Sequence, residues 1–87
     1  MRTVWKYELE TVEVQTIMMP AGGKIRMVAP QRGEICLWVE LDPEAPAVGR
    51  QFVMYGTGHP LRGGEEEYIG SVQLSGGSLV FHIYERS

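Results

Sequence analysis

Apolar and polar residues alternate with a period of two along most of this chain, in short segments that end at Gly or Pro. This period is typical of β-strands, because successive side chains of a strand point to opposite faces of the sheet. The most regular segment is 34–41, where one face is aliphatic and the other carries Cys36 and Trp38. Since both faces are apolar, 34–41 is predicted to be a central strand.

Short strands at intervals of about 8–12 residues, separated by glycine turns, are typical of small antiparallel proteins. The chain is therefore predicted to be all-β, a small antiparallel sandwich or open barrel of about six to seven strands. Two stretches without periodicity, the proline-containing 42–49 and the acidic 62–67, are expected to be exposed connections. The predicted strands are 3–9, 12–19, 24–29, 34–41, 51–55, 68–74 and 78–85.

Length and composition favour one globular domain over residues 1–87, with 44% hydrophobic residues. No apolar run approaches the roughly 18 residues of a membrane span, and no secretory signal is expected. Cys36 is the single cysteine, so no internal disulfide can form, which favours a reducing, cytoplasmic setting. A net charge of −3 argues against nonspecific binding to duplex nucleic acid.

The chemically richest stretch is 50–62, a predicted strand that runs into a Gly-Thr-Gly-His-Pro loop. Its glycines allow a ligand to approach the backbone, and its arginines favour an anionic ligand on which an aromatic ring stacks. In the alternative interpretation, the two glycines only turn the chain in a hairpin. The candidate ligand-binding residues are Arg50, Tyr55, Gly56, Thr57, Gly58, His59 and Arg62, with Trp38 as a further ring.

Signals for catalysis and metal binding are weak. The chain lacks the paired spacing of zinc ligands, and His82 fits a hydrogen-bonded histidine within a strand. The serines have no G-x-S-x-G elbow. We therefore expect a binding domain with no catalytic residues, no metal and no cofactor.

A partner-binding surface is the competing hypothesis. Met18 and Met19 are adjacent and point to opposite faces of a strand, so one of them is a candidate for an adaptable interface. A core this small is also expected to be completed by self-association, most simply as a homodimer.

Several stretches resemble the DUF7352 family of small proteins from bacteriophages, prophages and their hosts. The resemblance covers nearly the whole chain and implies a cytoplasmic accessory protein of the bacterial host, with no family site residues to transfer. The function expected is a host-defence antagonist that sequesters a small anionic nucleotide. The alternative is an inhibitor of a host protein or a phage assembly component, which binds through a sheet edge or a Met/aromatic patch. The motifs are Val4-Trp-Lys-Tyr-Glu-Leu9, Gln15-Thr-Ile-Met-Met-Pro20, Cys36-Leu-Trp38, Tyr55-Gly-Thr-Gly-His-Pro60, Tyr68-Ile-Gly70 and Gly77-Ser-Leu-Val-Phe-His82.

Overall fold

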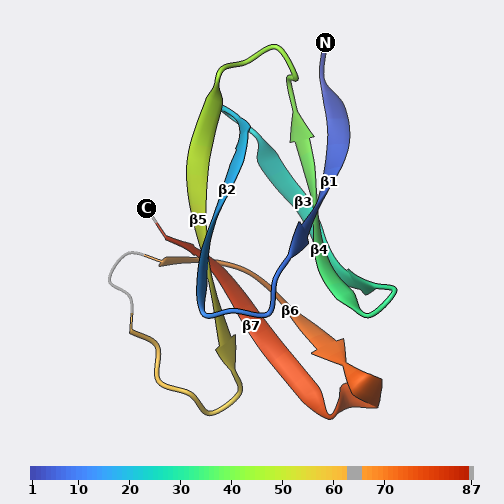
Figure 1. Ribbon diagram of the computed structural model, residues 1–87, viewed down its shortest axis with the longest axis vertical. Coiled ribbons are helices and arrows are strands. Elements are labelled where there is room, and N and C mark those ends of the chain that lie inside the picture. The colour runs from blue at the N-terminus through green and yellow to red at the C-terminus, as the bar shows by residue number, and fades with distance from the viewer. Residues whose placement is uncertain (63–65, 87) are drawn as a thin grey trace.

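The computed structural model describes residues 1–62 and 66–86, which form seven strands and one turn of 3-10 helix, Ser75–Gly77 (Figure 1). None of the helical structure in these residues is long and apolar enough to cross a membrane. The strands are β1 (Thr3–Leu9), β2 (Val14–Pro20), β3 (Lys24–Gln31), β4 (Glu34–Leu41), β5 (Ala47–Gly56), β6 (Glu66–Leu74) and β7 (Leu79–Arg86).

The strands form two antiparallel sheets that pack as a sandwich, which confirms the predicted all-β fold. The three-stranded sheet has the order β1-β4-β3, and the four-stranded sheet has the order β2-β5-β7-β6 (Figure 1). β4 lies in the middle of its sheet, as its two apolar faces predicted. Because β6 lies beyond β7, the connection from β5 to β6 is not a hairpin.

The core lies between the inner faces of the two sheets. Leu37 and Val39 of β4 face Phe52 of β5 and Ile83 of β7, and each is at most 1% exposed. Burial of each such side chain contributes about 1.5–3 kcal/mol. The opposite face of β4 is covered as well, because Cys36 is fully buried there. Burial raises the pKa of the Cys36 thiol.

Strand ends differ from the sequence predictions where pairing extends a strand into a stretch without periodicity. β5 begins at Ala47, because 47–49 pair with 18–20 of β2, so the irregular connection is shorter than predicted. β6 begins at Glu66, which lies opposite Arg86. Residues 63–65 of the predicted acidic loop lie outside the described residues.

β3 and β6 belong to different sheets and approach each other on one side of the sandwich. The contact is close because Gly70 of β6 has no side chain: a Cβ built there would collide with Cγ1 of Val28. Each strand also has a register shift, between Ile25 and Met27 in β3 and between Tyr68 and Gly70 in β6. Such bulges bend a strand. β3 and β6 are therefore expected to approach each other closely only over part of their length.

Candidate functional site between the two sheets

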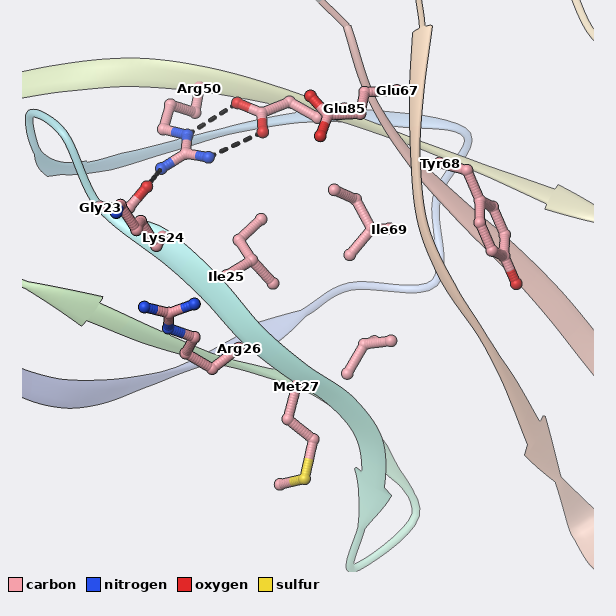
Figure 2. Close-up of a pocket in the computed structure, with 11 residues that line it drawn as sticks. Gly23, Lys24, Ile25, Arg26, Met27, Arg50, Glu67, Tyr68, Ile69 and Glu85 are labelled. Atoms are coloured by element: carbon pink, nitrogen blue, oxygen red, sulfur yellow. Dashed lines mark hydrogen bonds and ion pairs between the residues drawn. The ribbon is translucent and has the colours of Figure 1, made fainter.

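Beside this contact, β3 and β6 enclose a cleft with a volume of about 360 Å³, here called the inter-sheet cleft (Figure 2). Its size falls within the range of about 300–1,000 Å³ that is usual for small-molecule sites. One wall is Gly23–Val28, leading into and along β3, and the other is Glu67–Ile69 of β6, with Arg50 and Glu85 at one end.

The walls of the inter-sheet cleft are apolar at their centre. The side chains of Ile25 and Ile69 point toward one another across it (Figure 2). Met27 is 49% exposed and Tyr68 is 56% exposed on the two strands that line it. The Tyr68 ring points away from the cleft, toward Tyr84 and Ser71 on the outer face of β6, so the apolar part of a ligand would meet the aliphatic walls.

Arg50 and Glu85 form the polar end of the inter-sheet cleft. The guanidinium donates from Nε and Nη2 to the two carboxylate oxygens, both at 2.7 Å, and from Nη1 to the carbonyl oxygen of Gly23 at 2.6 Å. These contacts with Glu85 raise the pKa of Arg50 further. The predicted ligand cation Arg50 therefore lies in a cavity, but its guanidinium is held by the protein itself.

Cations outnumber carboxylates where the inter-sheet cleft meets the outer side of β3. Arg26 and Arg2 both bind Glu40, each with an N–O distance of 3.0 Å, and Lys24 lies opposite Glu40 in the strand pairing. The hydrogen bonds from Arg2 and Arg26 hold the pKa of the Glu40 carboxyl below its usual value. Among the residues that line the cleft itself, three cations, Lys24, Arg26 and Arg50, face two carboxylates, Glu67 and Glu85, which leaves a small excess of positive charge for an anionic ligand.

The loop predicted from the sequence forms a turn at the end of β5. The N–H of His59 donates to the carbonyl oxygen of Gly56 at 3.1 Å, and Gly58 adopts a φ of +89°. The His59 ring folds back over Gly56, where an added Cβ would lie 3.1 Å from it. Both glycines therefore have a conformational or steric role in the turn.

A second cavity of about 330 Å³ lies beneath this loop and is here called the loop cavity. The Tyr55 hydroxyl, at its base, donates to Glu66 at 2.8 Å and accepts the backbone N–H of Arg62 at 3.2 Å. Tyr55 is only 3% exposed, so its ring is not open to stacking. The residues that line the loop cavity are Glu13, Met54, Tyr55, His59, Pro60 and Arg62.

Thr57 joins the loop to the outer face of the four-stranded sheet through a hydrogen-bonded row. Its hydroxyl lies 2.8 Å from Nε2 of His82, and Nδ1 of His82 lies 2.7 Å from Oγ of Ser71. The Ser71 hydroxyl is in turn 2.7 Å from the hydroxyl of Tyr68. Both ring nitrogens of His82 therefore lie within hydrogen-bonding distance of a hydroxyl, as predicted from the sequence for a histidine within a strand.

The structure gathers only part of the predicted set of ligand residues. Tyr55, His59 and Arg62 line the loop cavity, whereas Arg50 lies in the inter-sheet cleft. Trp38 is on the outer face of the other sheet, opposite Lys6 and Met27, and joins neither cavity.

Sequence reasoning missed the residues that form the walls of the inter-sheet cleft. Basic and aliphatic residues alternate along Lys24–Met27, which marks a strand with one charged face. Nothing in the sequence shows that this strand lies beside 67–69, because the two strands do not pair. Among the described residues, no group of three His, Cys, Asp or Glu side chains is placed to hold a metal ion.

Comparison with curated proteins and with solved structures gave no match. Comparison with family models gave a match over residues 1–87 to a domain of unknown function, DUF7352. The matched range includes both strands of the inter-sheet cleft and the loop at the end of β5. Because the match extends over residues 1–87, the chain belongs to the DUF7352 family.

Proposed function

We propose that this protein is a non-catalytic binding protein for a small anionic ligand with a planar or apolar body, such as a nucleotide. The observation that carries this proposal is the composition of the inter-sheet cleft. Ile25 and Ile69 provide apolar walls, and the adjoining outer side of β3 presents more cations than carboxylates. Pockets that bind small molecules usually combine apolar walls with a few placed polar groups.

Lys24 is the cation on which the proposal depends most. It lines the inter-sheet cleft and is exposed, whereas Arg26 is already bound to Glu40 and Arg50 to Glu85. An ammonium group on a flexible stem can reach a phosphate without disturbing the ion pairs of the sandwich. We therefore assign the first contact with the anionic group to Lys24.

The arrangement around His82 supports a binding role over a catalytic one. Ser71 and His82 are within hydrogen-bonding distance, but Ser71 is exposed on the outer sheet face and lines neither the inter-sheet cleft nor the loop cavity. The second nitrogen of His82 contacts the Thr57 hydroxyl, where a catalytic triad has a carboxylate. A neutral hydroxyl stabilises a developing imidazolium much less than a carboxylate does.

A biological role follows if the resemblance to phage and prophage proteins extends to this chain. In that setting, the cytoplasm of a bacterial host, we propose that this protein sequesters a nucleotide signal and so acts as an antagonist of host defence. The alternative remains an inhibitor of a host protein or a phage assembly component. Either role requires a surface that contacts another protein, and neither requires a ligand in the cleft.

Titration of the folded protein with mononucleotides and cyclic nucleotides, followed by amide NMR shifts, tests the proposal. The shifts are expected to cluster on 23–28 and 67–69. Lys24→Glu is expected to weaken binding about tenfold or more, which corresponds to about 1.4 kcal/mol. No shift with any nucleotide at millimolar concentration would contradict the proposal.

A matched control separates a local contact from a general effect of charge. Lys6→Glu makes the same charge change on the same sheet, but Lys6 lies on β1 and its Nζ contacts Gln31 at 2.8 Å, outside the inter-sheet cleft. It is expected to leave binding within about twofold of the parent, because Lys6 does not line the cleft and salt screens the interaction of exposed charges that are not in contact. His59→Ala/Arg62→Ala reports on the loop cavity in the same way: loss of binding there would move the site to the loop.

A further inference from the structure

β1 is an edge strand that is regularly paired along its whole length and contains no bulge or proline. It pairs with β4 from Thr3 to Leu9 without a register shift, and Figure 1 shows it at the border of the molecule. The edge strands β3 and β6 each contain a bulge. Bulges, prolines and charges are the common means by which proteins block edge pairing, and of these β1 has only charges, Lys6 and Glu8.

The exposed apolar side chains of β1 lie near its middle. Val4 is 51% exposed and Trp5 is 43% exposed, although both are paired with β4 through their backbone. The free edge of this strand offers unpaired backbone N–H and C=O groups beside these side chains. An added strand would thus gain both backbone hydrogen bonds and apolar contact at the same place.

Two antiparallel registers of β1 with a second copy bring opposite charges together: one is centred on Trp5, and the other is centred on Tyr7 and places Lys6 opposite Glu8. A two-fold axis requires that residue i meets j and that j meets i, and both residues must point to the same face of the sheet. With Trp5 opposite Trp5 of a second copy, Val4 lies opposite Lys6. A register centred on Lys6 instead would place two lysines opposite each other, which is unfavourable.

The register centred on Tyr7 places Val4 opposite Glu10 and Trp5 opposite the buried Leu9, so the exposed Val4 and Trp5 favour the register centred on Trp5. Charges at the ends of β1 are also paired in the register centred on Trp5. In that register Arg2 of one copy lies opposite Glu8 of the other, twice in the dimer. Glu8 is exposed, and Arg2 uses Nε and Nη2 to bind Glu40, so part of its guanidinium stays open to a second carboxylate. Opposite charges across a strand pair stabilise it.

β2, the other regularly paired edge, carries no charged residue between Val14 and Pro20. Nothing in its sequence selects an antiparallel register, and Pro20 has no N–H to donate at its end. The two edges therefore differ in the specificity that they provide.

The geometry points to a homodimer in which β1 of one copy pairs antiparallel with β1 of a second copy, with Trp5 opposite Trp5. The two three-stranded sheets then form one continuous six-stranded sheet. β1 and β3 are opposite edges of the three-stranded sheet, so this dimer leaves the inter-sheet cleft open in both copies. The inference is therefore independent of the proposed ligand.

Light scattering after size exclusion tests the dimer on the unmodified chain. At high micromolar concentration the mass is expected to be about twice the chain mass of 9.8 kDa. Amide hydrogen exchange is expected to slow at alternate residues of β1 as concentration rises, because only every second N–H faces the free edge. A mass of 9.8 kDa at every concentration would overturn the proposal.

A pair of lysine substitutions identifies which edge forms the contact. Trp5→Lys places two lysines on the two-fold axis and is expected to raise the dimer dissociation constant at least tenfold. Met18→Lys makes a matching change at a residue of β2 that is 60% exposed, and it is expected to leave the dimer intact. An intact dimer in Trp5→Lys and a weakened dimer in Met18→Lys would overturn the assignment to β1. Circular dichroism checks that both variants fold.

Cross-linking of engineered cysteines tests the register without altering Trp5. Val4→Cys and Lys6→Cys proteins, mixed and treated with a short bis-maleimide, are expected to couple more efficiently than a mixture of Lys6→Cys and Glu8→Cys proteins. Cys36 is fully buried and is not expected to compete for the reagent. Higher yield from the second mixture would place Tyr7 on the axis and overturn the register centred on Trp5.

Discussion

Arg50 and Glu85 form a bidentate ion pair in which both N–O distances are 2.7 Å. The pair joins neighbouring strands β5 and β7, and the remaining terminal nitrogen of Arg50 reaches the carbonyl oxygen of Gly23 at 2.6 Å. Gly23 immediately precedes β3, so one guanidinium links the four-stranded sheet to the start of a strand in the other sheet. The polar end of the inter-sheet cleft thus also connects the two layers.

Arg50→Ala is expected to lower the free energy of unfolding by about 2 kcal/mol. The substitution leaves Glu85 and the Gly23 carbonyl without their donor, and hydrogen bonds to charged groups contribute about 1.5–3 kcal/mol. Both side chains of the pair are about four-fifths buried, with exposed fractions of 18% and 20%. Urea denaturation at neutral pH measures the change.

Arg62→Ala is the control for Arg50→Ala. Arg62 lies 3.9 Å from Glu13, and both side chains are more than half exposed. An exposed pair contributes about 0–1 kcal/mol, so the loss is expected to be small. Equal losses for the two variants would mean that the contacts of Arg50 with Glu85 and Gly23 contribute no more to stability than an exposed ion pair.

Gly70→Ala is expected to destabilise the protein by about 1–3 kcal/mol, the usual cost of overpacking. The added methyl group would collide with Cγ1 of Val28 on β3. Val28→Ala/Gly70→Ala is expected to recover part of this loss, because the smaller residue at 28 removes the colliding atom. A double variant as unstable as the sum of the single ones, measured by urea denaturation, would contradict close packing of β3 on β6.

Glu40 is expected to make stability depend on pH in the acidic range. Its hydrogen bonds with Arg2 and Arg26 lower its pKa in the folded state. The stabilisation is therefore complete above the unfolded-state pKa of about 4.3 and is lost as pH falls through the lower folded-state value. Carboxyl NMR titration is expected to give a lowered pKa for Glu40, and the stability difference between parent and Glu40→Gln is expected to shrink in acid.

Gly58→Val is expected to cost about 1–3 kcal/mol, because a β-branched residue at a φ of +89° is strained. Apart from its chain neighbours Thr57 and His59, no atom of the described residues lies within 4 Å of an added Cβ at Gly58, so the expected penalty is backbone strain. Thermal unfolding measures the change. An unchanged melting temperature would mean that the turn relaxes to another conformation at little cost.

The sequence by itself determined the strands and the class of fold. Period-two alternation depends on neighbouring residues alone, so it placed 34–41 as a central strand and gave the bounds of 3–9 directly. The alternation did not predict a strand at Ala47–Gly49, because these residues become part of β5 only through pairing with β2. The glycines of the Gly-Thr-Gly-His-Pro loop signalled a turn, since a positive φ at Gly58 favours glycine.

Only the tertiary structure decided which side chains share a cavity. Arg50 and His59 are close in sequence, but Arg50 reaches the inter-sheet cleft and His59 lines the loop cavity at the far end of β5. In the four-stranded sheet β7 lies between β5 and β6, so the loop after β5 does not close a hairpin between these two strands. Ile25 and Ile69 face each other across the cleft only because of how the two layers pack, and no local pattern encodes that arrangement.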